Sequence, residues 1–256
     1  MGDRYTLRKT NHEPYGTRFK PMGSIQEESR NFKQYDADAF IGTDNLQIVD
    51  DLSLTAFVGV GTNYQNMEMV SASGGDFIVP FLVNAKNTKN QSTGYNFREK
   101  QIESLYGSAE FGFQDWAFFT VTARNDWFST LSLKDKESPN NDLYTSASLS
   151  LVLSDVMDLG DTVSFLKLRG GYSQVAGGAD SPYALSLSYG IYGQGHLGAS
   201  LGTISGGTIP NSEITPFEKN ETEFGFDLRL FDNKLSIDAT YYDNETLGDI
   251  VGVSAS

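Results

Sequence analysis

Apolar residues alternate with small or polar residues in several segments of the chain, and the clearest of these segments runs from Leu143 to Ser154. Leucine, threonine and alanine occupy the odd-numbered positions, whereas Tyr144 and four serines occupy the even-numbered positions, with Val152 as the exception. A period of two indicates a β-strand, because successive side chains in a strand point to opposite faces of the sheet. The segment is also long enough to cross a bilayer as part of a barrel, which takes roughly 9–11 residues.

The same alternation recurs along the chain and predicts about eight antiparallel strands in total. The other alternating segments lie at about residues 34–48, 52–62, 104–113, 117–126, 165–173, 222–230 and 235–242. Short polar segments predict tight turns at 49–51, 114–115, 156–161 and 232–233, whereas the connections at 62–95, 134–142 and 174–220 are long. Outer-membrane barrels alternate short periplasmic turns with long extracellular loops in this way. Residues 1–33 are polar without a pattern, so we expect a loop there, and strands with their connecting loops over 34–253.

Composition excludes several classes of protein. The 256 residues contain no cysteine and only two histidines, far apart in sequence, so we expect no disulfide, no catalytic thiol and no metal site. A net charge of −14 argues against nucleic acid as a partner, because such binding needs a basic surface. No apolar run is long enough for a transmembrane helix. No apolar segment of a secretory signal follows Met1, so we expect a mature product or an internal piece of a longer chain.

Charged residues of the patterned segments all fall on the face opposite the apolar one. In a barrel this face lines the lumen, where charges stay hydrated, whereas Arg or Lys facing lipid at mid-bilayer would cost roughly 2–4 kcal/mol. Aromatic residues cluster near the predicted strand ends, as in the aromatic girdles of membrane barrels. The candidate lumen-lining residues are Arg124, Asp126, Lys167, Arg169, Asp227 and Arg229.

Two other folds also contain alternating strands. A soluble β-sandwich that binds glycans would bury the apolar face between two sheets, but its strands are usually nearer five or six residues. A small self-closed barrel of about eight strands could act as a porin or a surface adhesin. The strand lengths and the alternation of short with long connections favour a transmembrane barrel, and the pattern alone leaves both alternatives open.

Several stretches carry a resemblance to one family. The segment Thr122–Leu131 is similar to "T-x-R-N-D-W-S-S-T-L" of SusC/RagA-type TonB-dependent transporters of Bacteroidetes outer membranes, with Phe128 where that family usually has Ser. The segment Leu166–Val175 resembles "K-L-R-x-S-Y-x-x-V-G", and Ile209–Lys219 resembles "N-P-N-L-K-P-E" with Phe217 inserted. Further similar stretches at 104–109, 225–231 and 238–243 follow the order of the family and extend the resemblance from about residue 35 to 250.

The resemblance implies a segment of a larger barrel of about 22 strands in the bacterial outer membrane, which the chain would cross several times. It implies import of large nutrients, either glycans or oligopeptides, and no enzymatic activity or cofactor. The expected partners are the remainder of the same barrel, outer-membrane lipid, a SusD-like surface lipoprotein that caps the mouth, and the TonB complex. TonB would act through an N-terminal part that this sequence does not contain, since neither a plug nor a TonB box is recognisable.

Candidate contact residues for substrate or lid lie in the long connection from 174 to 220, where a strand tip is expected near 183–192. They are Tyr183, Tyr189, Tyr192 and His196, whose rings could stack on sugars or could merely order the loop. Arg124 and Asp126 could line the substrate path or brace a plug. Paired carboxylates such as Glu223 and Asp227 do not suggest a glycosidase, because residues four apart on a strand lie roughly 13 Å apart.

Overall fold

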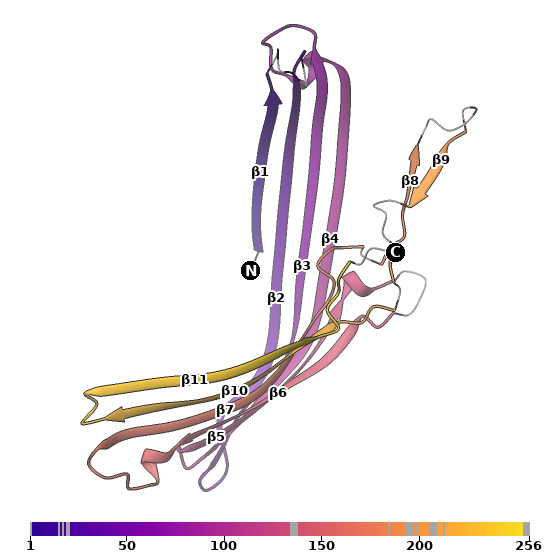
Figure 1. Cartoon of the computed structure of the whole chain (residues 1–256). Helices are drawn as coiled ribbons and strands as arrows, with labels where there is room; N and C mark the ends of the chain where they lie inside the picture. Colours follow the sequence, from indigo (N-terminus) through magenta and orange to yellow (C-terminus); the bar gives the residue numbers. More distant parts are fainter. Residues whose placement is uncertain are drawn as a thin grey trace. The chain divides into compact units, whose positions relative to one another are not determined.

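The computed structural model describes residues 2–14, 16, 18, 21–133, 138–183, 185–192, 197, 199–204, 209–211 and 213–252. Within these residues the fold is all-β and antiparallel, as predicted, and helical structure is limited to short 3-10 turns (Figure 1). No helix in this part of the chain has the length and apolar character needed to cross a membrane. The strands are β1 (Gly2–Glu13), β2 (Ser24–Val49), β3 (Leu52–Phe77), β4 (Thr88–Phe113), β5 (Ala117–Phe128), β6 (Asn141–Val152), β7 (Val163–Gly177), β8 (Tyr189–Tyr192), β9 (Leu201–Ile204), β10 (Phe217–Leu230) and β11 (Leu235–Leu247).

Nine of these strands form one sheet, in which hydrogen-bonded neighbours follow the order β1-β2-β3-β4-β5-β6-β7-β10-β11. The remaining two, β8 and β9, pair with each other in a separate hairpin between β7 and β10. The chain divides into two compact units. The first comprises residues 1–37 and 62–101, and the second comprises residues 38–61 and 102–256, so β2, β3 and β4 contribute residues to both.

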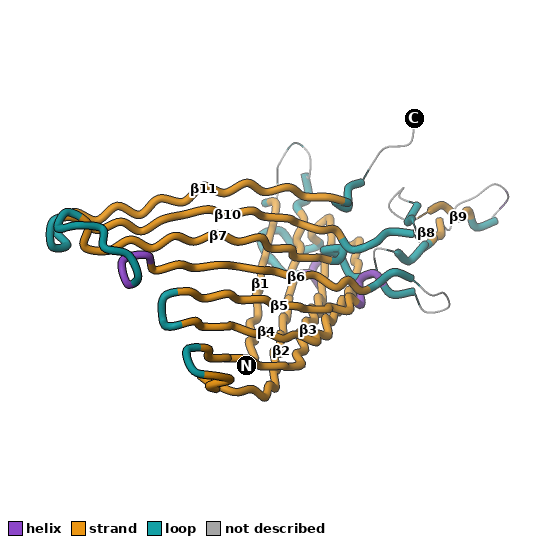
Figure 2. The backbone as a smooth tube through the Cα atoms, turned by 90° about the horizontal axis from the view of Figure 1, so that it is seen from below, coloured by secondary structure: helices purple, strands orange, loops and turns teal. Residues whose placement is uncertain are grey.

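Short turns of the second unit lie at one end of its strands and the long connections at the other (Figure 2). The predicted turns at 49–51, 114–115, 156–161 and 232–233 are confirmed, with positive φ at Asp51, Gln114, Asp115 and the three residues 231–233. Asn and Asp tolerate this left-handed conformation better than most residues, which explains their place in these turns. Backbone hydrogen bonds join neighbouring turns, from the N–H of Gln114 to the carbonyl of Asp51 (2.9 Å) and from that of Phe231 to Thr162 (3.0 Å).

The two faces of the second unit differ in chemistry across the whole sheet. One cross-strand row on the apolar face runs Ala117, Leu151, Leu168, Phe226 and Ala239 from β5 to β11. These side chains are not covered by a second sheet in the described chain, and Leu168 and Phe226 remain 40% and 36% exposed. The alternative of a β-sandwich, which would bury this face, is therefore wrong for this fold.

A small buried cluster lies where the long connections of the second unit meet the strand ends. Phe128, Leu131, Ala179 and Leu185 are its buried members, and four partly buried residues pack against it: Ile102, Leu133, Ile214 and Ile250. The long connections of this unit are thus tied to the strand ends by apolar contacts rather than lying free.

The first unit corrects the expectation of a loop over 1–33. Residues 2–13 form β1, which pairs with Ser24–Tyr35 of β2, and β3 and β4 extend to Phe77 and back from Thr88 through the stretch expected to be irregular. Both faces of this part of the sheet carry polar side chains, so the strands leave no apolar alternation in the sequence. The sheet therefore has nine strands rather than about eight.

Candidate functional site

The charged face of the second unit carries two side-chain networks, the first of which centres on Arg124 and Asp126 of β5. Arg124 Nε donates to Asp126 Oδ1 (2.8 Å) and its Nη2 donates to Ser104 Oγ of β4 (2.8 Å), while Tyr144 Oη of β6 donates to Asp126 Oδ2 (2.6 Å). The Asp126 side chain is only 8% exposed. Cross-strand register brings these groups together, because Arg124 stands opposite both Tyr106 and Tyr144. The network fastens three neighbouring strands to one another.

An aromatic row continues from this network onto β3 and β2. The ring centroids of Phe40 and Phe57 are 6.0 Å apart, and those of Phe57 and Tyr106 are 6.1 Å apart, both in edge-to-face geometry. The Arg124 guanidinium lies 5.4 Å from the centroid of the Tyr106 ring, and Tyr106 Oη donates to Asp38 Oδ1 (3.0 Å). The same face thus presents aromatic and charged groups side by side.

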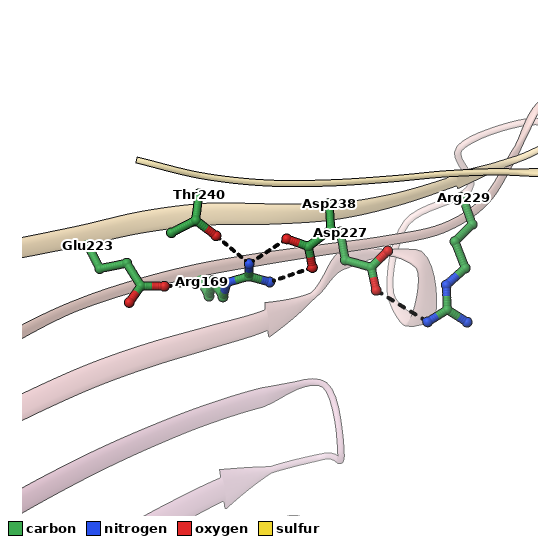
Figure 3. A network of polar contacts seen from close by, with 6 residues as sticks. All are labelled: Arg169, Glu223, Asp227, Arg229, Asp238 and Thr240. Atoms are coloured by element: carbon green, nitrogen blue, oxygen red, sulfur yellow. Dashed lines mark hydrogen bonds and ion pairs between the residues drawn. The ribbon is translucent and has the colours of Figure 1, made fainter. Parts of the chain in front are cut away.

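The second network centres on Arg169 of β7 and is drawn in Figure 3. Arg169 donates to both carboxylate oxygens of Asp238 on β11 (2.7 and 3.3 Å) and to Thr240 Oγ1 (2.5 Å), with Glu223 of β10 3.6 Å away on its other side. Gly225 stands opposite Arg169 on the intervening strand, and a Cβ there would lie 2.7 Å from Arg169 Nε. The missing side chain lets the guanidinium reach across β10.

Asp227 and Arg229 form a pair on β10 next to this network. Arg229 Nη2 lies 3.2 Å from Asp227 Oδ2, and its guanidinium lies 4.7 Å from the centroid of the Phe165 ring. Lys167 stands opposite Asp227 in the register. All six candidate lumen-lining residues therefore occupy one face, but they form separate clusters.

Each arginine among these candidates is engaged by a carboxylate of the same face. Arg124 is bound by Asp126, Arg169 by Asp238, and Arg229 by Asp227. Such pairing leaves little unsatisfied positive charge for an anionic ligand, and the Arg169–Asp238 pair also links β7 to β11 across β10. No group of His, Cys, Asp and Glu in the described chain has the arrangement of a metal site. This geometry suits a hydrated wall.

The family model described as TonB dependent receptor-like, beta-barrel matches residues 1–255. The chain belongs to this family. Its members are receptor and transporter barrels rather than enzymes.

Relatives of this TonB-dependent receptor-like barrel are much longer proteins. TonB-dependent receptor P3 of Formosa agariphila is 24% identical over 200 residues, which cover 73% of this chain and 19% of that receptor. The RagAB peptide transporter superposes with a TM-score of 0.80 at 18% identity, covering 96% of this chain and 27% of that one. The RagAB peptide importer gives TM-scores of 0.79 in its closed-closed state and 0.76 in its open-open state. The chain thus spans about a fifth to a quarter of the length of these proteins and shares their barrel fold.

Two of the four predicted loop contacts of this receptor-like barrel, Tyr183 and Tyr189, have side chains in the described part of the chain. Tyr183 is 51% exposed with a positive φ of 62°, and Tyr189 is 66% exposed at the start of β8. Among the described side chains neither tyrosine has a ring contact. The backbone of Tyr192 ends β8, its side chain is outside the described part, and His196 lies outside the described residues. Their role in binding stays a prediction.

Sequence reasoning missed the partners that complete the two networks. Asp38, Tyr106 and Tyr144 complete the first, and Asp238 and Thr240 complete the second. The alternation of apolar and polar positions places these residues on the polar face, and this was the sequence feature that could have identified them as candidates. Alternation does not give the cross-strand register, and register decides which residues of that face meet.

Proposed function

We infer that this chain forms part of the wall and extracellular rim of an outer-membrane TonB-dependent transporter that imports large nutrients, either glycans or oligopeptides. The observation that carries this proposal is the two-faced sheet of the second unit. One face is apolar and exposed from β5 to β11, and the other bears paired charges. Hydrocarbon on one side and a water-filled lumen on the other satisfy both faces.

Strand length supports the same placement. Spanning the bilayer takes roughly 9–11 residues per tilted strand, and β5 and β6 have 12 residues each. In contrast, β2, β3 and β4 have 26 residues each, so more than half of each strand lies beyond the hydrocarbon. The turns of the second unit are short, as periplasmic turns are, which supports an extracellular position for the long parts of these strands.

Single-cysteine labelling tests the placement of the two faces, since the chain has no native cysteine. In outer membranes that contain the full-length protein, a polar maleimide should label cysteine at Ser148 or Thr122 on the charged face. Cysteine at Leu149 or Phe226 on the apolar face should resist it. Equal labelling of both faces would contradict a lumen on one side and lipid on the other.

The proposed function also implies the partners of this chain. The outer edges of β1 and β11 have no neighbouring strand in the described sheet, and strands from the remainder of the barrel would pair there. TonB would supply energy through an N-terminal part beyond this sequence. A SusD-like lipoprotein would cap the extracellular mouth.

An exposed apolar loop between β3 and β4 supports a protein lid at the extracellular end. Ile78, Val79 and Leu82 are each more than half exposed, and Phe81 is 84% exposed. Asn87 fixes this loop, because its side chain accepts from the Val79 N–H and donates to the carbonyls of Val79 and Leu82. An ordered apolar patch of this kind is typical of a protein interaction surface.

Co-purification tests this surface. In the full-length transporter, the double substitution Phe81→Ser and Leu82→Ser should reduce recovery of the SusD-like lipoprotein at least fivefold. Ile191→Ser on β8 provides a control, because Ile191 is 78% exposed outside the apolar loop. If the lipoprotein were recovered equally with both variants, this loop would not be part of the lid interface.

Growth assays test transport itself and separate it from the porin or adhesin alternatives. A strain that lacks the full-length gene should lose growth on a particular glycan or oligopeptide as sole nutrient, and loss of TonB should reproduce the defect. Uptake that continues without TonB would favour a porin. Normal growth on every nutrient combined with loss of surface attachment would favour an adhesin.

A further inference from the structure

A polar hollow in the first unit lies outside the networks described above. It has a volume of about 430 Å³, which falls in the usual range of small-ligand sites. Four neighbouring strands form it, through residues 11–13 of β1, 24–26 of β2, 73–75 of β3, and Asn90 of β4. The hollow therefore sits on a sheet rather than on a loop, which favours a fixed geometry.

The surroundings of the hollow are locked by backbone and side-chain contacts. The N–H groups of Asp76 and Phe77 donate to the carbonyls of Gly23 (3.0 Å) and Met22 (2.9 Å), which fastens the β1–β2 connection to the end of β3. Ile25 and Phe77 are 3% and 2% exposed. These contacts preform the hollow, so a ligand would pay little to order it.

The lining side chains have unused hydrogen-bonding capacity. Six of the lining residues form no side-chain hydrogen bond with the described chain: Asn11, His12, Glu13, Ser24, Gln26 and Ser73. By register Asn11, Glu13, Ser24 and Gln26 share one face of the sheet, and His12 lies on the other. Amide and hydroxyl groups both donate and accept, and the lining contains no lysine or arginine and one carboxylate. Mixed donors and acceptors with little net charge match a ligand that is itself rich in neutral hydroxyl groups. An extended peptide would instead add to the outer edge of β1, whereas the hollow is formed by groups on four strands.

Two adjacent glycines form part of the lining in different ways. A Cβ at Gly74 would lie 1.9 Å from Thr88 Oγ1, so this position is packed against β4. A Cβ at Gly75 would meet nothing within 4 Å, and the backbone there is not left-handed. A side chain can therefore be added at Gly75 into open space without displacing the protein around it.

We propose that this hollow binds a neutral sugar residue of a glycan. Its position outside the cell rests on the proposed function, whereas the binding itself does not. In a transporter, such a site at the far end of the long strands would hold a saccharide before it enters the lumen. The amides of Asn11 and Gln26 and the hydroxyls of Ser24 and Ser73 would hydrogen-bond to the sugar hydroxyls.

The binding test uses the full-length protein in detergent, with maltohexaose, cellohexaose, mannohexaose and laminarihexaose as neutral probes, measured by calorimetry. At least one hexasaccharide should bind. Gly75→Leu, which adds a bulky side chain at the lining of the hollow, should weaken that binding at least tenfold, and Gln26→Ala should weaken it about fivefold. Gly202→Leu on β9 is the matched control, because a Cβ at Gly202 also meets nothing within 4 Å, and it should bind as the wild type does.

Three results would overturn the proposal. They are the failure of all four hexasaccharides to bind, binding that Gly75→Leu and Gln26→Ala both leave unchanged, and a hollow that instead captures a neutral Gly-Ser hexapeptide in a Gly75-dependent way. If Gly75→Leu impairs folding, Gln26→Ala decides alone. Nutrient-dependent growth is scored separately, so a lost sugar site with intact uptake would reject this inference and leave the transporter function standing.

Discussion

At the scale of single residues, two arginine–carboxylate pairs of the charged face differ in how strongly they are embedded. The Asp126 carboxylate is 8% exposed and also accepts a hydrogen bond from Tyr144, whereas the Asp227 carboxylate beside Arg229 is 19% exposed. A buried carboxylate that loses its partner keeps its full desolvation cost, whereas an exposed pair contributes little. The two pairs therefore serve different purposes despite similar sequence contexts.

Arg124→Leu should destabilise the folded protein by about 1.5–3 kcal/mol, because it leaves the Asp126 carboxylate without its cation. Arg229→Leu should cost less, about 1 kcal/mol, since the Asp227 side chain is more exposed than that of Asp126. Urea unfolding of the full-length protein in detergent or lipid vesicles measures both. Equal losses would show that the Arg124 network contributes no more than a surface ion pair.

Gly225 provides a second prediction at this scale. Gly225→Val should destabilise the protein by about 1–3 kcal/mol, because the new side chain overlaps the Arg169 guanidinium and blocks its path to Asp238. Gly171→Ala is the control, because a Cβ there makes ordinary contacts of 3.4 Å and longer. Unfolding midpoints of the two variants should differ, and a harmless Gly225→Val would show that Arg169 reaches Asp238 by another route.

Residue-level reasoning from sequence placed the six charged residues on the correct face but could not pair them. Arg169 meets Asp238, 69 residues later, across an intervening strand. That contact depends on the registers of β7 with β10 and of β10 with β11, and on the glycine between them. Neither register follows from alternation, because a strand shifted by two residues shows the same pattern of faces.

At the scale of elements, the turns and the strands of the second unit were predictable, whereas much of the first unit was not. Turn residues such as Asp51 and Asp115 are predictable because Asp tolerates the positive φ that these turns require. The strands beside them have one apolar face. By contrast, β1 is exposed along its whole length, and its backbone pairing with β2 leaves no trace in hydropathy. Strands that carry polar residues on both faces show no alternation of apolar with polar positions, so this pattern cannot predict them.

Substitutions in the β8–β9 hairpin and in the segment that precedes it should affect the stability of the fold differently. Replacing residues 189–204 with a short Gly-Ser linker should leave stability unchanged, because β8 and β9 pair only with each other in the described chain. Leu185→Ala should cost about 2–5 kcal/mol, since Leu185 is 6% exposed in the buried cluster with Phe128 and Leu131.

Thermal unfolding of the full-length protein measures both changes. If the hairpin contacts substrate through Tyr189, the replacement should also reduce nutrient-dependent growth while the unfolding temperature stays constant. A large drop in that temperature would show instead that the hairpin stabilises the fold.

At the scale of the whole molecule, the two faces of the sheet require two different surroundings, hydrocarbon for the apolar face and water for the charged face. Its apolar rows would be unstable in water and its ion pairs would be unstable in hydrocarbon, so each face determines what lies against it. Sequence could predict this division, because it depends on alternation alone. It could not predict the ninth strand or the reach of β2, β3 and β4, which depend on pairing between polar strands.

Two neighbouring residues of β6 allow this division to be tested with one substitution. Leu149 lies on the apolar face and Ser148 on the charged face, both are exposed in the chain, and they occupy nearly the same depth. Leu149→Arg should reduce the free energy of folding into lipid vesicles by about 2–4 kcal/mol, the cost of a lipid-facing arginine near mid-bilayer. Ser148→Arg should cost under about 1 kcal/mol, because the new charge stays in water. If the two arginines proved equally costly, or equally harmless, hydrocarbon could not be what covers the leucine face.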